Sequence, residues 1–309
     1  MAHILWLLLL FGSASLSLRS APEKLQPWTT VLREQQPEDA FAAVYRVGSH
    51  RLVFVAARHE NRIESLTFRT IREAYAMFKF DTVIAEGFPN SWGANPARIF
   101  EYVERNGAGK DGFVEGGETV PTALGARQQG AALLGGEADD LEIKQQVLAQ
   151  GFSTGDLLGF YVLRTIPQWI REQKIKDAGD SRLRALVGEA LARNRERLKL
   201  GPDVLAGFSD WAAWYQGKNG RPIGGSFRTE EVGPLADGTY GTNKLAYAVS
   251  RARDTYLHEL VIAHLNGQEN VLVVFGGSHL MIHRPALDAV LGAPCYVGAD
   301  IKRARTTCR

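Results

Sequence analysis

Ionisable side chains follow four apolar segments of the chain, each at the point where a buried strand is expected to end. The segments are RLVFVAARH, DTVIAEGF, AALLGGE and NVLVVFGGSH, and the four residues are His59, Glu86, Glu137 and His279. In open parallel sheets, ligands bind outside the carboxyl ends of the strands. A charged group near an apolar core needs a partner. We therefore expect the two imidazoles and two carboxylates to meet at one edge of a sheet.

Such a cluster suits two kinds of chemistry. Imidazole nitrogens and carboxylate oxygens are ligands for divalent zinc, manganese or iron, so His59, His279 and Glu86 are candidate metal ligands. Without a metal, the same groups would form an acid/base cluster around a substrate. The pairs Gly135-Gly136 and Gly276-Gly277 would let the backbone turn sharply and a ligand approach closely.

Each of these residues also has a purely structural interpretation. A lone histidine after a strand is commonly a hydrogen-bonded structural residue, and a Gly-Gly pair is commonly a turn. Glu86 can simply cap the following segment, and His283 is open as a ligand, a support for one, or a helix-start residue. The sequence has no H-E-x-x-H motif, no P-loop, and no G-x-G-x-x-G motif that follows a predicted strand. The agreement of four strand ends is what favours a shared site.

The segments between these residues predict an α/β fold with a mostly parallel central sheet flanked by helices. Apolar residues at helical spacing over 63–78 connect the strands at 51–59 and 81–88, and this crossover length suits a parallel pair. Further helices are expected over 97–107, 139–151 and 242–267, and an edge strand near 295–297. Residues of about 153–240 are helical in pattern and rich in aromatics. They predict a helical insertion over the carboxyl edge of the sheet.

The composition is that of an ordinary globular protein. The chain has 309 residues, of which 45% are hydrophobic, and 36 basic against 34 acidic side chains give a net charge of +2. This balance argues against a nucleic-acid partner. The N-terminal stretch MAHILWLLLLFGSASLSL is too short for a comfortable bilayer span and predicts a signal peptide over 1–21. We then expect one domain over 22–309, exported to the periplasm or secreted, with no stable membrane anchor.

The two cysteines, Cys295 and Cys308, both lie near the end of the chain. In an exported protein they could close a short loop and hold the C-terminal tail. The alternative is one buried thiol and one thiol on a frayed tail, and the sequence leaves this choice open.

Two stretches resemble the TraB/TIKI family, whose wider group includes the ChaN-type haem-binding proteins and the erythromycin esterases. VFVAARHENRIES with FKFDTVIAEGFP is similar to its opening, where a strand ends in Gly-x-x-His and the next strand ends in Glu. SRARDTYLHELVIAHLNGQENVLVVFGGSHL is similar to its late portion, where an Arg-Asp pair on a helix precedes a second Gly-x-x-His. The resemblance covers about 50–150 and 240–290. The first motif departs from the pattern, with Ala56 in place of Gly.

The resemblance implies roles for His59, Glu86, Arg253 and His279, and three functions. The leading one is an exported, metal-dependent hydrolase acting on a peptide or other amide, with His59, His279 and a carboxylate holding the metal. Glu86 or Glu137 would then activate water and Arg253 would stabilise the oxyanion. The second is a haem- or planar-ligand-binding protein of the ChaN type, with aromatic residues of the insertion forming its wall. The third is a metal-free His/Glu esterase.

The export interpretation predicts that the mature chain begins between about Ser15 and Pro22. N-terminal sequencing of protein isolated from its native host checks this, and a retained Met1 in a cytosolic fraction would contradict it.

Overall fold

A single six-stranded sheet forms the centre of the computed structural model, which describes residues 17–107 and 110–309. The strand order is β4-β3-β5-β2-β1-β6. The strands are β1 (Phe41–Val47), β2 (His50–Ala57), β3 (Thr82–Pro89), β4 (Ala132–Glu137), β5 (Val271–Gly276) and β6 (Tyr296–Gly298). The apolar stretch of the predicted signal peptide falls in 1–16 and lies outside the described residues.

Four neighbouring strands of the sheet are parallel, which confirms the predicted fold class. β2 pairs with β5, β5 with β3 and β3 with β4, all in parallel. β6 is an edge strand, antiparallel to β1, as the sequence predicts for 295–297. β1 was not anticipated from the sequence. It pairs antiparallel with β2 across the turn at Gly48, whose φ of 61° suits glycine.

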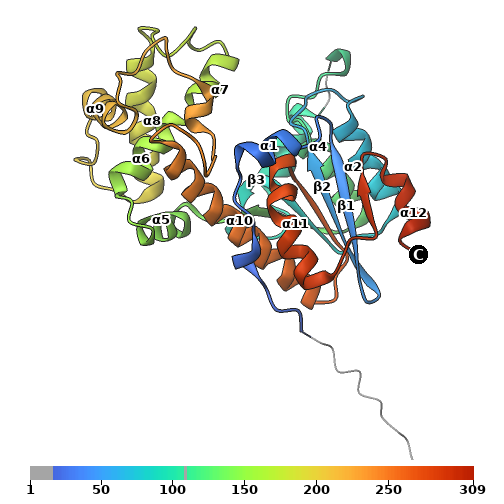
Figure 1. Ribbon diagram of the computed structural model, residues 1–309. Helices are drawn as coiled ribbons and strands as arrows, with labels where there is room; N and C mark the ends of the chain where they lie inside the picture. Colours follow the sequence, from blue (N-terminus) through green and yellow to red (C-terminus); the bar gives the residue numbers. More distant parts are fainter. Residues whose placement is uncertain (1–16, 108–109) are drawn as a thin grey trace, which may run out of the picture.

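Helices cover both faces of the sheet (Figure 1). They are α1 (Thr30–Gln35), α2 (Leu66–Met77), α3 (Ala97–Asn106), α4 (Thr119–Gln129), α5 (Asp140–Ala149), α6 (Thr154–Leu163), α7 (Ile166–Arg171), α8 (Leu183–Leu198), α9 (Phe208–Asn219), α10 (Asn243–Asn266), α11 (Gly277–Leu291) and α12 (Ala304–Thr307). Short 3₁₀ turns are η1 (Pro22–Lys24), η2 (Asn90–Trp92), η3 (Lys110–Gly112), η4 (Thr229–Val232) and η5 (Ile301–Arg303).

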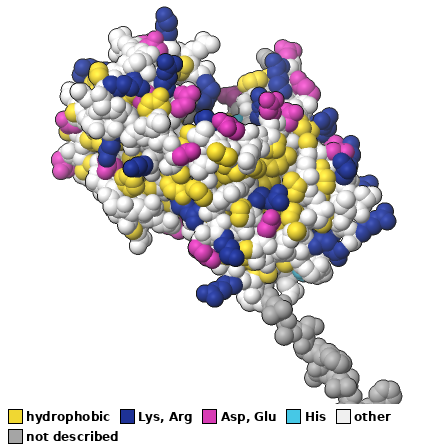
Figure 2. All heavy atoms as spheres, in the orientation of Figure 1, with side chains coloured by type: hydrophobic (Ala, Val, Ile, Leu, Met, Phe, Trp, Pro, Cys, Tyr) yellow, Lys and Arg dark blue, Asp and Glu magenta, His cyan; other side chains and the backbone are white. Residues whose placement is uncertain are grey.

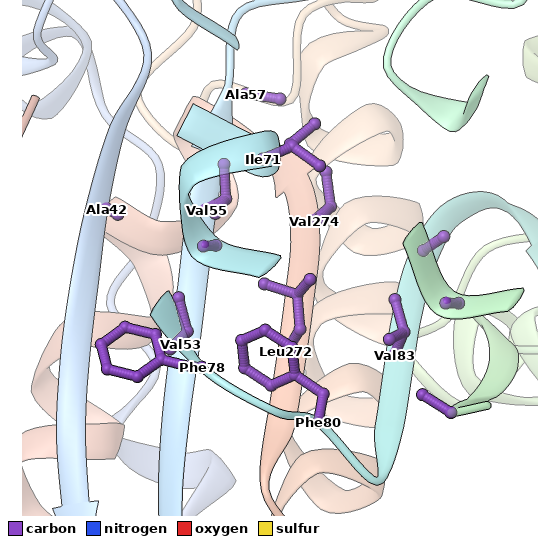
Figure 3. Packing of buried hydrophobic residues seen from close by; sticks show 14 of the residues in the cluster. Ala42, Val53, Val55, Ala57, Ile71, Phe78, Phe80, Val83, Leu272 and Val274 are labelled. Carbon is purple, nitrogen blue, oxygen red and sulfur yellow. The ribbon is translucent and has the colours of Figure 1, made fainter. Parts of the chain in front are cut away.

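Successive side chains of a strand point to opposite faces of the sheet. Alternate residues of each central strand therefore pack into two different hydrophobic cores. Val53 and Val55 of β2 point to the side of α2, where they meet Ile71 and Leu272 (Figure 3). Phe54, between those two valines, packs on the other face with apolar residues of α10 and α11. Because both faces are covered, the strands are apolar throughout, and all six residues of β5 are buried.

Helices α5 to α9 form a separate helical lobe with its own core, beside the sheet in Figure 1. The helical character expected for 153–240 is thus what the structure shows. Two aromatic residues of this segment, Trp211 and Tyr215, are fully buried within the lobe, whereas Trp214, Phe208 and Phe227 are partly buried at its border. Trp211 and Tyr215 pack against neighbouring helices, so they stabilise the lobe and do not face a cleft.

Helix α10 packs in both the helical lobe and the core around the sheet. Its first half, including Leu245 and Val249, packs into the lobe, whereas Leu257 and Val261 of its second half pack against the sheet. With 24 residues it is about 36 Å long, enough to run through both cores. Across residues 17–107 and 110–309 the structure has no helix long and apolar enough to cross a bilayer.

The segment before β1 is tied to the far end of the chain. The Arg251 guanidinium donates to the carbonyls of Pro22 and Leu25, and the Gln26 N–H donates to the carbonyl of Ile282. Trp28 packs with apolar residues of α11 in a small core of its own. This segment therefore fastens α10 to α11 on one side of the sheet.

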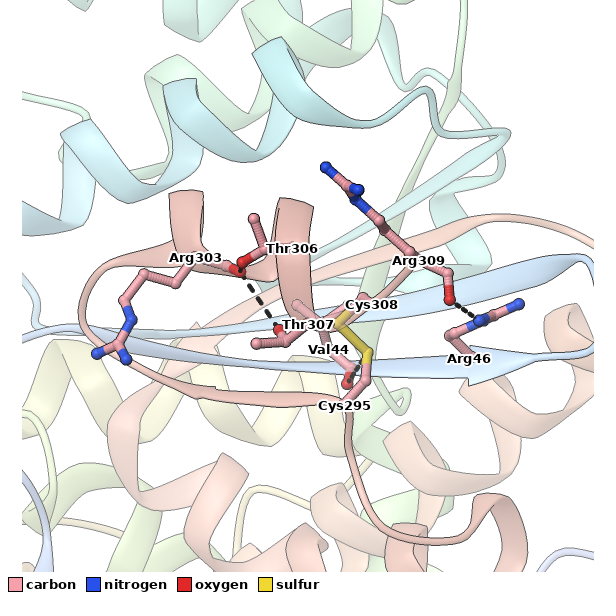
Figure 4. The surroundings of a disulfide bond; sticks show 8 residues. All are labelled: Val44, Arg46, Cys295, Arg303, Thr306, Thr307, Cys308 and Arg309. Carbon is pink, nitrogen blue, oxygen red and sulfur yellow. Dashed lines mark hydrogen bonds between the residues drawn. A yellow bond between two sulfur atoms is a disulfide. The ribbon is translucent and has the colours of Figure 1, made fainter.

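Cys295 and Cys308 form a disulfide, which decides between the two alternatives left open by the sequence (Figure 4). Cys295 also donates its N–H to the Val44 carbonyl of β1. The short helix α12 precedes Cys308, and buried Ala304 of α12 packs into the core beneath it. The bond thus holds the C-terminal tail against the edge of the sheet.

Replacing both cysteines by serine should lower the free energy of unfolding by about 2–4 kcal/mol, because the cross-link restricts the unfolded chain. Urea denaturation of the oxidised wild-type protein and of Cys295→Ser/Cys308→Ser measures the difference. Arg305→Ala, an exposed change in the same tail, should leave the stability within about 0.5 kcal/mol. Equal stability of the double variant and the wild-type protein would contradict a stabilising bond.

Candidate functional site

The strand order brings the four sequence-predicted strand ends side by side. β5 inserts between β2 and β3, so the sheet carries β2, β5, β3 and β4 as neighbours. The attached residues therefore follow one another along the carboxyl edge as His59, His279, Glu86 and Glu137. Only the details differ from expectation. Glu86 lies within β3, next to an irregularity in its pairing with β4, and His279 lies in the first turn of α11.

Glu86 is the centre of this group. Its Oε1 accepts a hydrogen bond of 3.1 Å from Arg253, and its Oε2 accepts one of 2.7 Å from the N–H of Gly276. The Nε2 atom of His279 is 3.6 Å from Oε1, and that of His59 is 3.9 Å from Oε2. Burial alone would raise the pKa of Glu86. The close approach and charge of His279, followed by the charges of Arg253 and His59, instead hold this pKa well below its usual range.

His279 is held by a buried carboxylate on α10. Its Nδ1 is 2.5 Å from Oδ1 of Asp254, and the same oxygen is 3.2 Å from Nε2 of His283. Asp254 has only 2% of its side chain exposed. Burial by itself lowers the pKa of His279, but the charge and hydrogen bond of Asp254 outweigh burial and, with Glu86, raise the pKa to about 10. His279 is therefore an imidazolium at neutral pH, and His283 supports its partner.

His59 has the same arrangement at the open side of the site. Its Nδ1 is 2.5 Å from Oε1 of Glu118, the residue before α4. The hydrogen bond to Glu118 raises the pKa of His59, although burial works against it. With 64% of its side chain exposed, His59 presents Nε2 to solvent beside Glu86. Both histidines thus keep Nδ1 on a carboxylate and direct Nε2 toward one shared carboxylate.

Arg253 links the strand ends to α10. Its Nε and Nη2 atoms form a two-fold contact with Glu137 at 2.6 and 2.5 Å, and Nη2 also reaches Glu86. The Gly87 N–H donates to Glu137 at 3.4 Å. Both oxygens of Glu137 are therefore engaged. These contacts suit a positioning role for Glu137 better than the role of a base that takes a proton from water.

The two glycine pairs serve different purposes. A Cβ on Gly276 would lie 2.9 Å from Nε2 of His59 and 3.4 Å from Oε2 of Glu86, so glycine is needed there for the site residues to approach. A Cβ on Gly135 would instead clash with the backbone of Phe88, and one on Gly136 with the ring of Phe275. Close packing, and not access for a ligand, explains the pair at Gly135-Gly136.

A cavity of about 300 Å³ lies beside the cluster, between the helical lobe and the ends of β3 and β4. Gly87, Glu137 and Arg253 form its wall on the sheet side. Tyr161 and Arg164, in and directly after α6, lie on the lobe side together with Arg197 of α8. We call it the lobe cavity. Its size is at the lower end of the range for small-molecule sites.

The geometry does not favour the predicted metal ligands. Among residues 17–107 and 110–309, no group of three or more His, Cys, Asp or Glu side chains is arranged to hold a metal ion. Both oxygens of Glu86 already accept hydrogen bonds, and the Arg253 guanidinium brings positive charge next to them. The arrangement is better suited to proton transfer between an exposed imidazole and a buried imidazolium. Metal binding by His59, His279 and Glu86 stays a prediction.

Sequence reasoning missed two carboxylates in the network. Asp254 follows Arg253 directly and was visible as part of the Arg-Asp pair, but only Arg253 was assigned a role. Glu118 lies in a region without a strong periodic pattern, and no feature of the sequence indicates that it reaches His59. His258, one turn after Asp254, is buried beside His283, with ring centroids 5.8 Å apart.

Comparisons with protein-family models, with curated proteins and with solved structures find no match to this chain. The TraB/TIKI resemblance therefore stays a prediction, and the geometry of the site carries the functional argument.

The stability of the fold should fall as the pH rises from about 7 to 9. The native state holds the His279 proton up to a pKa of about 10, whereas a histidine in the unfolded chain has an ordinary pKa of about 6.5, so the native state binds one more proton between these values. Urea denaturation across this range measures the slope, and NMR of the imidazole ring measures its titration. In Asp254→Asn the slope should flatten, because burial then dominates the pKa of His279.

A matched variant, His264→Ala, removes a histidine from the far end of α10, where it contacts Glu269, and should keep the wild-type slope. Titration of His279 at or below pH 6.5 in the wild-type protein would contradict the imidazolium assignment.

Proposed function

We propose that this protein is a hydrolase of an amide or ester bond, using water activated by His59 beside Glu86. One observation carries the proposal. Two imidazoles, each held at Nδ1 by its own carboxylate, direct Nε2 toward the same carboxylate, Glu86, at 3.9 and 3.6 Å. Their surroundings differ, since one is exposed and the other is buried. Pairs of titratable groups in contrasting environments are typical of an acid and a base that act together.

His59 is suited to be the general base. When Glu118 accepts the Nδ1 proton, the lone pair of Nε2 is free to take a proton from water. A water within hydrogen-bond distance of both Nε2 of His59 and Oε2 of Glu86 spans the 3.9 Å between them. Glu86 would orient this water while staying ionised, because its pKa is lowered.

His279 is suited to the opposite task. As an imidazolium with Nδ1 on Asp254, it can donate a hydrogen bond from Nε2 to an oxygen that gains negative charge. It can also give its proton to the leaving group. Arg253 is engaged by Glu86 and Glu137, so its first effect is to hold these two carboxylates in place. The oxyanion role predicted for Arg253 is thus better filled by His279.

Two alternatives use the same residues differently. In the metal-dependent hydrolase, zinc, manganese or iron would be held by His59, His279 and Glu86 and would supply an activated water. The hydrogen bonds on both oxygens of Glu86 speak against this arrangement. In the haem-binding alternative, aromatic residues of the insertion form a wall for the ring, but Trp211 and Tyr215 are committed to the core of the lobe.

Export is part of the proposal. The disulfide between Cys295 and Cys308 supports an oxidising compartment, where such bonds form and persist. On the face in Figure 2, basic and acidic side chains are interspersed, which suits a small-molecule or peptide substrate better than a nucleic acid. The periplasm and the extracellular medium both fit.

His59→Ala and Glu86→Gln should each lower kcat/KM by roughly 10²–10⁴-fold, because each removes one part of the acid/base unit. The double variant should be little worse than either single variant, since the two residues act on one water. Hydrolysis of p-nitrophenyl esters and of amino-acid p-nitroanilides measures this, with thermal unfolding as the check on the fold. His264→Ala serves as the histidine control and should keep wild-type activity.

Dialysis against 1,10-phenanthroline and EDTA distinguishes the alternatives. Activity that survives chelation is expected. Activity that disappears and returns with zinc, manganese or iron would establish the metal-dependent alternative, and a Soret band in the purified protein would establish haem binding.

A further inference from the structure

The lobe cavity contains one guanidinium that has no carboxylate in ion-pair contact, although Asp140 is close enough to raise its pKa somewhat against the larger lowering by burial. Arg253 is paired with Glu137 and Glu86, and Arg197 is paired with Asp140 at 2.8 Å. Among the described residues that line the cavity, Arg164 is the arginine without an ion pair. Its guanidinium carbon lies 4.1 Å from the centre of the Tyr161 ring, and burial lowers its pKa. Removing a cation from water without a carboxylate partner is costly, which suggests that a ligand supplies the partner.

A second polar group in the same wall is also unsatisfied. Tyr161 is 1% exposed and lines the lobe cavity, and among the described residues its hydroxyl has no partner within normal hydrogen-bond distance. Burial, and to a smaller degree nearby Asp140, raises its pKa. A buried hydroxyl normally finds a partner, because leaving it unpaired forfeits the hydrogen bonds that it makes with water in the unfolded chain. Arg164 follows Tyr161 by three residues, so both groups come from one turn at the end of α6. Two donors near Asp140 therefore border the same cavity without an acceptor in direct contact.

We infer that Arg164 and Tyr161 form a subsite for a carboxylate of the substrate. A guanidinium donates two parallel hydrogen bonds to a carboxylate, and a phenol hydroxyl can donate a third. The substrate would then be a small amide or ester that bears a free carboxylate near the bond to be cleaved, as at the C-terminal end of a short peptide. This inference rests on the proposed function for the position of that bond.

The remaining charges of the cavity favour a carboxylate over a phosphate. Glu137, Asp139 and Asp140 also line it, so negative charge is already present. Asp140 is paired with Arg197, and Asp139 accepts a hydrogen bond from the Ser91 hydroxyl. A singly charged group can balance Arg164 alone. A phosphate, with about two charges at neutral pH, would add repulsion from the three carboxylates.

The subsite lies next to the cluster of His59, His279 and Glu86 at the edge of the sheet. The lobe cavity is bounded on its other side by Gly87 and Arg253, and Gly87 follows Glu86 directly. A molecule held by Arg164 would therefore extend toward the end of β3, where Glu86, His279 and His59 lie. Binding energy from the carboxylate, away from the reacting atoms, would then position the bond to be cleaved.

The test compares N-acetyl-L-alanine with N-acetyl-L-alanine amide, which differ only in the carboxylate, by NMR titration of the full-length mature protein. The wild-type protein should bind the carboxylate form more tightly. Arg164→Ala should weaken this binding by roughly 10–100-fold and leave the amide form unaffected, because a charge-assisted hydrogen bond is lost. Arg164→Lys keeps the positive charge but cannot donate two parallel hydrogen bonds to a carboxylate, so its affinity for N-acetyl-L-alanine should fall by an intermediate factor.

Two further variants separate recognition from folding. Tyr161→Phe removes a hydroxyl that makes no bond within the fold, so thermal stability should stay equal or rise while binding of the carboxylate form weakens roughly 3–10-fold. Arg171→Ala, an exposed arginine on the next helix, should change neither quantity. Equal binding of the two probes, or unchanged binding in Arg164→Ala, would overturn the subsite. Tighter binding of inorganic phosphate than of N-acetyl-L-alanine would overturn the choice of a carboxylate.

The outcomes also separate this inference from the proposed function. Binding of N-acetyl-L-alanine through Arg164, in a protein that hydrolyses no amide or ester, would overturn the hydrolase and keep the subsite. Hydrolysis that needs His59 but is the same in wild-type and Arg164→Ala protein, for a carboxylate substrate and its amide alike, would keep the hydrolase and overturn the subsite.

Discussion

The ion pairs of Arg253 with Glu86 and Glu137 are the interaction on which the rest of the site depends. They join two neighbouring strands to α10 at the position where this helix passes from the core of the lobe to the core of the sheet. Asp254, the next residue, holds His279 from the same turn. Removing one partner from a buried charge network typically costs about 3–5 kcal/mol, because the other charges stay behind. The same ion pairs therefore connect the core of the lobe, the core around the sheet and the candidate site.

The sequence predicts the class of fold and the residues at the strand ends, because both depend on local patterns. Buried parallel strands are continuous apolar runs, and the polar residue that ends such a run is visible without knowledge of its neighbours. The same local view cannot give the strand order, so the position of β5 between β2 and β3 had to come from the structure. β1 was overlooked although its signal is local, because FAAVY is a run of five apolar residues and Gly48 follows as a turn residue before β2.

Partners of a site residue are harder to predict than the residue itself. Glu118 lies 59 residues after His59 in the sequence, and no periodic pattern connects them. The aromatic residues of the lobe show that the number of such residues does not indicate where they point. Their number suggested a wall for a ligand, whereas a lobe of short helices needs large side chains to fill its own core. The unpaired groups at Tyr161 and Arg164 show only in three dimensions, since a sequence does not reveal which polar atoms lack partners.

The C-terminal tail held by the disulfide also affects whether β1 can pair with a strand of another copy of the chain. β1 has seven residues but pairs with β6 only over Ala42 to Val44, so its remaining backbone groups lie at the border of the sheet. The tail continues past Cys308 to the end of the chain, where the carbonyl of Arg309 accepts a hydrogen bond from Arg46 of β1. An uncovered strand border is a template for pairing with a strand of another copy. The covalent bond that holds the tail against β1 therefore also limits how much of this border is open to a strand of another copy, and the border is more open in a chain whose two cysteines are reduced.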